Sequence, residues 1–243
     1  MKSAAATHSV IEALTHQHPN ADTELHYRNA FELLVATMLS AQSTDAGVNK
    51  VTPSLLAKFP DARALAVAPA AEVEALIHAT GFFRQKAKSL TGMSRALVER
   101  HGGEVPRTME ALVKLPGVGR KTANVVLGHA LGVPGLPVDR HVLRVSHRLG
   151  IADSDDPERV EQQLTGALPP GLWTRASDTL ILHGRRVCKP EPLCEECAVT
   201  DACEFYVEAS REGKPDPPPS AGTKRRKPAG ASPRKKALAR RRR

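Results

Sequence analysis

The sequence is poor in aromatic residues and has no long apolar run. Only 3% of its 243 residues are Phe, Trp or Tyr, whereas Ala and Leu are frequent, and this composition favours helices over sheets. No stretch alternates apolar and polar residues over the length of a strand, so we expect an all-α fold. No segment is long and apolar enough to span a bilayer, and the start of the chain contains no continuous apolar run. We therefore expect an intracellular protein, not secreted, with no membrane partner.

Apolar periodicity places the expected helices along the chain. Residues 1–9 lack a clear pattern and are expected to be frayed. Helical spacing of apolar residues predicts the following helices: 10–14, 25–42, 46–59, 61–68, 71–79, 86–101, 108–115, 121–131, 141–149, 157–168 and 172–184.

Cysteine is confined to one short segment near the C-terminus. Cys188, Cys194, Cys197 and Cys203 follow one another closely, in the pattern Cys-x5-Cys-x2-Cys-x5-Cys. Such clustering argues for metal ligation rather than for disulfides. Four thiolates suit a zinc ion and an iron–sulfur cluster equally well, so the spacing alone does not choose between these two groups.

Positive charge is concentrated at the end of the chain. The formal net charge is +9, but residues 211–243 hold 13 Lys or Arg and two acidic residues, so this segment carries +11 and residues 1–210 carry −2. We expect residues 207–243, which are rich in Pro, Gly, Lys and Arg, to form a disordered basic tail. The tail is either a solvated appendage or a non-specific phosphate binder.

Residues 114–124, KLPGVGRKTAN, span the junction between the predicted helices 108–115 and 121–131. Pro116 is unfavourable inside a helix, and Gly117 and Gly119 allow a tight turn. The segment therefore predicts a helix, a glycine-rich hairpin and a second helix, whose N-terminal amides can bind a phosphate. The structural alternative is a hairpin that only packs two helices and leaves Lys121 in solvent.

This segment resembles the helix-hairpin-helix of the endonuclease III family of DNA glycosylases. In that family the lysine that corresponds to Lys121 is the Schiff-base nucleophile. An aspartate follows that lysine in a Val-Asp-Thr-His segment, and Asp139 follows Lys121 at the same interval here, with Arg140 in place of the threonine. The resemblance implies that Lys121 and Asp139 form a catalytic pair, whereas Asp139 taken alone could be only a helix N-cap.

Two further segments resemble parts of the family that open the DNA duplex. Gln42, in LSAQSTD, corresponds to a glutamine that fills the space left by the extruded nucleotide. Phe82 follows Thr80-Gly81, where the family commonly has a wedge leucine. The structural alternatives are a helix C-cap for Gln42 and a core side chain for Phe82. The resemblance also implies DNA contacts from these residues: Gly117, Val118, Gly119, Arg120, His141 and Lys189.

The resemblance extends to the cysteines. The family carries a C-terminal [4Fe-4S] loop with spacing x6-x2-x5, and the first interval is one residue shorter here. The resemblance therefore favours a [4Fe-4S] cluster over zinc. It also implies two all-α lobes: a six-helix barrel over residues 23–133, with the helix-hairpin-helix at about 108–131, and a cluster domain made of residues 1–22 and 134–206.

The function that the resemblance implies is a bifunctional DNA glycosylase and AP lyase of base excision repair. Such an enzyme would remove oxidised pyrimidines of the thymine glycol type from damaged double-stranded DNA and cleave 3′ to the abasic site by β-elimination through a lysine Schiff base. We expect a monomer, cytoplasmic and nucleoid-associated if the source is bacterial. The alternatives are a monofunctional adenine or mismatch glycosylase and a non-catalytic DNA-binding protein, and Lys121 argues against both.

Overall fold

The structure is a computed structural model that describes residues 1–211, and within this range the chain forms helices, turns and loops without a strand. The predicted all-α fold is confirmed for this part of the chain. Residues 212–243, which hold most of the predicted basic tail, lie outside the described residues. No helix among residues 1–211 is long and apolar enough to cross a membrane.

The helices are numbered in chain order. The α-helices are α1 (Ala4–Gln17), α2 (Ala30–Leu39), α3 (Asp45–Lys58), α4 (Ala62–Ala66), α5 (Ala70–Ile77), α6 (Phe83–His101), α7 (Met109–Leu112), α8 (Arg120–Ala130), α9 (Arg140–Leu149), α10 (Pro157–Ala167), α11 (Trp173–Arg186) and α12 (Glu204–Arg211). The 3₁₀ helices are η1 (His78–Thr80), η2 (Pro170–Leu172), η3 (Cys194–Glu196) and η4 (Thr200–Ala202).

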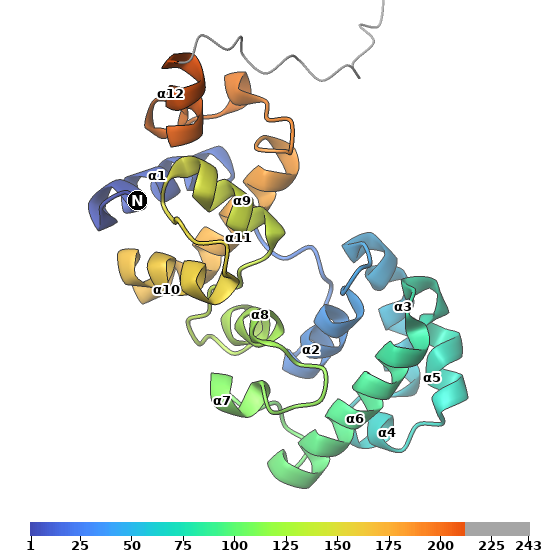
Figure 1. The fold of residues 1–243 in the computed structure, drawn as a ribbon. Coiled ribbons are helices and arrows are strands. Elements are labelled where there is room, and N and C mark those ends of the chain that lie inside the picture. The colour runs from blue at the N-terminus through green and yellow to red at the C-terminus, as the bar shows by residue number, and fades with distance from the viewer. Residues whose placement is uncertain (212–243) are drawn as a thin grey trace, which may run out of the picture.

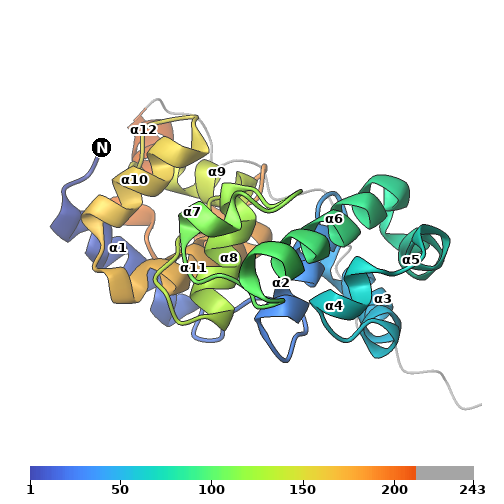
Figure 2. The ribbon, with the colours of Figure 1, turned by 90° about the horizontal axis from the view of Figure 1, so that it is seen from below.

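The helices enclose two separate hydrophobic cores. The first core is built from α2 to α8, and the second from α1, α9, α10, α11 and the cysteine segment. Both views show α3–α6 at one end of the molecule and α1, α10 and α12 at the other, with α8 between them (Figure 1, Figure 2). The predicted division into two domains stays a prediction, and the two cores support it.

Helix α8 joins the two cores. Its residues Ala123, Val125, Val126 and Leu127 are buried in the first core. The helix packs against α2 and α7 and also against α11, which belongs to the second core. Side chains on α8 can therefore take part in a site that both cores line.

The N-terminal segment is ordered by contacts that the sequence pattern did not reveal. Ser3 caps α1, because its side chain accepts a hydrogen bond from the amide of Ala6. The amide of Lys2 donates to the carbonyl of Gly150 over 2.7 Å, which ties the chain start to the turn after α9. The expectation that residues 1–9 are frayed is wrong.

Capping residues explain where other helices begin. Helix α2 begins at Ala30 rather than near residue 25, because Asn29 accepts a hydrogen bond from the amide of Glu32 over 3.0 Å. Thr44 caps α3 in the same way through the amide of Gly47. Pro53 lies inside α3 without dividing it.

Helix α12 begins before the predicted tail and continues into it. It extends to Arg211, so the assignment of residues 207–211 to a disordered segment is wrong. The guanidinium of Arg148 lies 4.8 Å from the ring centroid of Phe205, and Tyr206 packs against the second core. These two aromatic contacts hold the helix on the end of the molecule.

Candidate functional site

Lys121 and Asp139 line one cavity between the two cores. Lys121 is exposed in the first turn of α8, and Asp139 is the N-cap of α9. The cavity has room for about 70 Å³. Its other lining residues include Thr37, Asp45, His129, Asp178, Leu182 and Arg185. The structure thus brings together the two residues that the sequence predicts as a catalytic pair.

Asp139 uses one carboxylate oxygen to begin α9. Its Oδ1 accepts hydrogen bonds from the amides of His141, over 2.7 Å, and Val142, over 2.9 Å. Among residues 1–211 its Oδ2 has no hydrogen-bond partner within the chain. The helix cap therefore orients the carboxylate and leaves its second oxygen available to the cavity.

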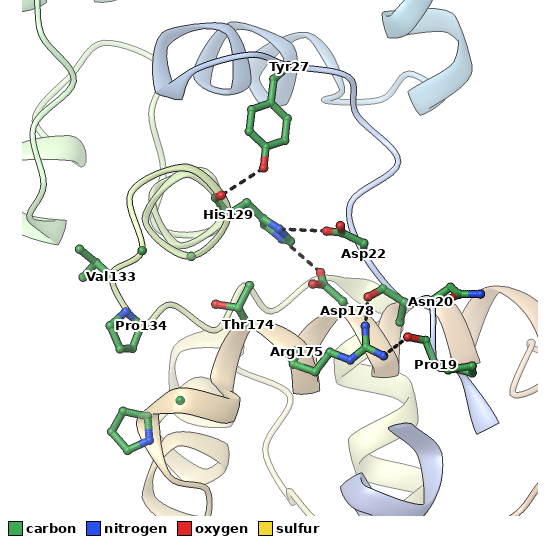
Figure 3. Close-up of a pocket in the computed structure, with 15 residues that line it drawn as sticks. Pro19, Asn20, Asp22, Tyr27, His129, Val133, Pro134, Thr174, Arg175 and Asp178 are labelled. Carbon is green, nitrogen blue, oxygen red and sulfur yellow. Dashed lines mark hydrogen bonds and ion pairs between the residues drawn. The ribbon is translucent and has the colours of Figure 1, made fainter. Parts of the chain in front are cut away.

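The side chain of His129, which is 6% exposed, lies between the carboxylates of Asp22 and Asp178. These three residues line the Lys121–Asp139 cavity and also a neighbouring pocket of about 730 Å³, which Figure 3 shows. The Nε2 of His129, on α8, lies 3.2 Å from Asp178 of α11, and its Nδ1 lies 3.3 Å from the exposed Asp22. Tyr27 donates a hydrogen bond to the carbonyl of His129 over 3.1 Å. Burial would lower the pKa of His129, but the hydrogen bonds and charges of Asp178 and Asp22 raise it above its usual value.

Two ion pairs also connect the helices on either side of the cavity. Arg120 donates from Nε and Nη2 to the carboxylate of Glu161 on α10, each over 2.8 Å. Arg185 of α11 binds Glu24 over 2.8 Å and Asp45 over 2.9 Å. The guanidinium of Arg120 is therefore paired with Glu161, although its side chain is 40% exposed. A DNA contact by this side chain stays a prediction.

The hairpin needs glycine at residue 117 for two reasons. Its φ of +76° lies in the left-handed region, and a Cβ there would come within 2.9 Å of the Ser89 Cβ and 3.0 Å of the Met38 Cε. Val118 is buried in the first core and anchors the hairpin. Gly119 is the N-cap of α8, and a Cβ there would meet nothing within 4 Å. The hairpin backbone at Gly119 is thus open to an approaching ligand.

Gln42 and Phe82 share an unusual backbone conformation. They have φ values of 56° and 46°, in a region that non-glycine residues seldom adopt, and each such residue costs about 1–3 kcal/mol. Phe82 is 69% exposed, so it is not a core residue. Gln42 lies beyond Ser40, the C-cap of α2, so it does not cap that helix. Both residues line a cavity of about 300 Å³ that also includes Gly117.

His141 and Lys189 lie apart from the hairpin in the chain and have different surroundings. His141 is half-buried against α11, where a Cβ on Gly184 would come within 3.0 Å of its own Cβ. Burial lowers the pKa of His141, although the negative charge of Asp139 acts to raise it. Lys189 is exposed on the loop after Cys188. A DNA contact from either side chain stays a prediction.

The four cysteines line one cavity next to η3 and η4. Burial, together with the charges of the other three thiolates, raises the pKa of Cys194 to about 11. Burial also raises the pKa values of Cys197 and Cys203. Thiols that oppose one another's ionisation in this way are typical of a metal site, where the cation offsets the thiolate charges. The donor set therefore fits a metal group with four thiolate ligands.

Two arginines on α9 hold the loop that begins this cysteine segment. Arg144 donates to the carbonyls of Gly184 and Cys188. Arg148 donates to the carbonyls of Lys189, over 2.6 Å, and Pro190, over 2.8 Å. The sequence reading missed both residues, although their i, i+4 spacing places them on one helix face.

Two other polar residues have roles that the sequence shows only in part. His129 lies on an apolar helix, which is typical of a satisfied core or interface histidine, and the structure shows it so, but its carboxylate partners lie far from it along the chain. Lys86 is only 7% exposed and contacts the turns that carry Gln42 and Phe82. Helical spacing could have indicated this burial, because Lys86 lies in the same row of α6 as Leu90 and Leu97. The exposed Lys88 lies on another face of the helix.

Comparison with known proteins gives consistent matches. The family model of the HhH-GPD superfamily base excision DNA repair proteins matches residues 35–170. The chain is 52% identical to endonuclease III of Synechocystis over 188 residues, 76% of this chain and 86% of that protein. It is 40% identical to endonuclease III of Escherichia coli K12 over 197 residues, 81% of this chain and 93% of that protein.

Two solved structures were compared with the fold. A trapped covalent intermediate of endonuclease III and DNA has a TM-score of 0.81 at 40% identity, and the match covers 87% of this chain and all of that one. A thermostable thymine-DNA glycosylase has a TM-score of 0.76 at 22% identity, and the match covers 84% of this chain and 98% of that one. The second comparison concerns the fold alone.

Replacing each hairpin glycine with alanine should show that the fold requires glycine at residue 117 but not at residue 119. We expect Gly117→Ala to lower the free energy of unfolding by about 1–3 kcal/mol, because it combines a left-handed φ with two close contacts. Gly119→Ala should change it by less than about 0.5 kcal/mol, since the weaker N-cap and the stiffer unfolded chain offset each other. Urea denaturation measures both values, and equal losses would contradict this account.

The His129 contacts predict a pH-dependent contribution to stability. The pKa of His129 is raised in the folded state, so protonation of this residue stabilises the fold. The stabilisation is complete below the pKa of the unfolded chain, near 6.5, and is lost as the pH rises through the pKa of the folded protein. The difference in unfolding free energy between the native protein and His129→Gln should therefore be larger at about pH 6 than at about pH 9. The exposed His26, changed to Gln, is the control, and a difference independent of pH would refute the prediction.

Proposed function

The chain belongs to the endonuclease III family of HhH-GPD base excision DNA repair proteins, and we propose that Lys121 and Asp139 carry out its chemistry in the cavity between the two cores. The family relationship confirms the predicted helix-hairpin-helix glycosylase fold. The protein is a DNA glycosylase with AP lyase activity that acts on damaged double-stranded DNA. The single observation that supports the proposed residues is that Lys121 and Asp139 line the same cavity.

Lys121 is the nucleophile. Its amine attacks the sugar carbon that carries the damaged base, a bond forms between Nζ and that carbon, and the base leaves with the electrons of the broken C–N bond. The attached nitrogen then loses a proton, and the sugar ring opens as the bond from the same carbon to the ring oxygen breaks, which gives an imine. This imine acidifies the proton on the adjacent sugar carbon. Removal of this proton expels the 3′ phosphate by β-elimination and leaves a nicked strand. The exposed position of Lys121, in the first turn of α8, suits an attack on a nucleotide turned out of the duplex.

Asp139 assists this attack. The carboxylate stabilises the positive charge that develops on the sugar as the base leaves, or it accepts the proton of the attacking amine. Its Oδ1 is held by the amides of His141 and Val142, so the direction of Oδ2 is set before substrate arrives. Helix capping and catalysis are therefore compatible roles of one carboxylate.

The hairpin binds the DNA backbone. The amides of Gly117, Val118 and Gly119 and the N-terminus of α8 can bind a phosphate, and Gly119 leaves open space for its approach. This contact needs only the backbone of Val118, whose side chain is buried. The side chain of Arg120 is bound by Glu161, so Arg120 contributes to phosphate binding through its backbone amide at the start of α8. Lys189 meets a second stretch of phosphates.

Gln42 and Phe82 open the duplex. Gln42 fills the space of the extruded nucleotide, and Phe82 inserts between neighbouring bases. Both are exposed, and both line the cavity beside Gly117, which places them next to the hairpin that binds the backbone. The proposed substrates are oxidised pyrimidines such as thymine glycol.

A [4Fe-4S] cluster is held by Cys188, Cys194, Cys197 and Cys203. Their common cavity and the mutual effect of their charges support a group bound by all four sulfurs. Such a cluster supplies cross-links between loop segments that carry little regular structure. The loop that follows Cys188, tied to α9 by Arg144 and Arg148, would then present Lys189 in a fixed position.

Borohydride trapping tests the nucleophile. On a duplex with one thymine glycol, the native protein should form a covalent adduct with DNA that Lys121→Gln does not form, because reduction captures the Schiff base of Lys121. Asp139→Asn should lower the rate of adduct formation by about 10²-fold or more.

The same assay on a duplex with an abasic site separates the alternatives. Trapping only on the abasic duplex would keep the lyase and refute oxidised pyrimidines as the substrate. No trapping on either duplex would indicate a monofunctional glycosylase or a non-catalytic DNA-binding protein. An adduct that persists in Lys121→Gln would assign the nucleophile to another residue.

Metal analysis tests the cysteine ligands. The purified protein should contain about four iron atoms per chain and little zinc. Cys194→Ser should lose most of the iron, whereas the neighbouring exposed residue, changed as Glu195→Gln, should retain it. Zinc at about one atom per chain would refute the cluster, and full iron in Cys194→Ser would remove Cys194 from the ligand set.

A further inference from the structure

Lys86 joins the two turns that carry Gln42 and Phe82. It lies on α6, is 7% exposed, and directs its ammonium away from solvent. Its Nζ donates to the carbonyl of Leu39, the hydroxyl oxygen of Ser43 and the carbonyl of Thr80, each over 2.8 Å. The first two acceptors flank Gln42, and the third precedes Gly81 and Phe82. One side chain therefore spans the only two non-glycine residues with left-handed φ among residues 1–211.

The hydrogen bonds of this ammonium are complete. A protonated lysine has three donors, and Lys86 meets three acceptors. The hydroxyl of Ser43 in turn donates to the carbonyl of Thr80, so it can only accept from Lys86. Burial lowers the pKa of Lys86. The three acceptors favour the charged form, because a neutral amine would leave one of them without a donor.

Burying the ammonium of Lys86 costs desolvation free energy, which a residue that only packs the core would not need to spend. None of the three partners is a carboxylate, so the buried ammonium has no counter-charge among them. A methionine would fill the same space without the desolvation cost. What the ammonium provides, and methionine cannot, is a fixed geometry between backbone groups of two separate turns.

We propose that Lys86 is a positioning residue that holds the Gln42 and Phe82 turns at a fixed separation, so that both side chains enter an opened duplex together. This inference rests on the proposed function of those two residues. Lys86 also lines the cavity that Gln42, Phe82 and Gly117 share, so it lies directly beneath the surface that would meet the DNA. Without it, each turn could relax from its strained φ independently of the other.

The test compares a step that needs duplex opening with one that does not. Lys86→Met keeps an unbranched side chain, one atom shorter, and removes all three donors. Lys88→Met removes the same charge from an exposed residue on the same helix and is the matched control. The two substrates are a duplex with thymine glycol, where the base must be extruded, and single-stranded DNA with a preformed abasic site, where it need not be.

We expect Lys86→Met to lower the rate of base removal from the duplex by about tenfold or more, which is the loss of one charged hydrogen bond in the transition state. Its β-elimination on single-stranded abasic DNA should fall far less, and Lys88→Met should resemble the native protein on both substrates. Equal losses on the two substrates would indicate a general structural role and overturn the proposal. Unchanged rates on both would overturn it as well.

Two further variants keep the proposal testable if Lys86→Met does not fold. Ser43→Ala removes one acceptor and the direct link between the turns, so it should show the same selective loss to a smaller degree. In a Gln42→Ala background the same change should have a smaller effect, because the loss then acts on a turn whose side chain is already absent. Additive effects of Ser43→Ala and Gln42→Ala would overturn the proposal.

The outcome is distinguishable from a failure of the proposed function. If the native protein processes neither substrate, the glycosylase and lyase assignment fails whatever Lys86 does. If the native protein is active but Gln42→Ala and Phe82→Ala match it on the duplex, the duplex-opening roles fail and the proposal for Lys86 fails with them.

Discussion

The cavity between the two cores depends on polar contacts across it. The cavity is lined by charged and polar residues, so directional contacts rather than apolar packing link the helices at its edge. Arg120 with Glu161, His129 with Asp178 and Arg185 with Asp45 provide these links. Two of the three cationic partners lie on α8, the helix that also carries Lys121. Helix α8, which carries the proposed nucleophile, is thus linked to the second core near both of its ends.

Local signals in the sequence predicted the parts of the fold that local physics determines. Asp139 and Thr44 are short polar residues in front of apolar repeats, and both cap the helices that follow them. The same logic placed α2 too early, because its apolar residues begin before Asn29 and the cap overrides them. The order in residues 1–9 and in α12 comes from Gly150 and Arg148, which are distant in the sequence. Periodicity carries no information about such contacts.

The candidate site also has parts that the sequence predicts and parts that it does not. The sequence reveals the hairpin, the interval from Lys121 to Asp139 and the spacing of the cysteines, and the structure brings the last two sets of side chains together. Contacts that connect distant segments were not visible. The sequence predicts that Arg120 contacts DNA, and it does not reveal that Glu161, far along the chain, binds its guanidinium. Helical spacing distinguishes Lys86 from the exposed Lys88, but only the fold brings the acceptors of two separate turns to Lys86.

Gln42 and Phe82 both have an unfavourable backbone conformation, and the turns that carry them contact the same side chain, Lys86. Neither residue favours a left-handed φ by itself, so the surrounding structure must impose it. The carbonyls of Leu39 and Thr80 point at one ammonium, and this common partner can hold both turns at once. Exposed side chains on turns that are rigid beneath the surface lose little conformational freedom when they meet a ligand. The desolvation of the Lys86 ammonium is therefore a cost of folding, and in return the two turns are already held in place when the duplex is opened.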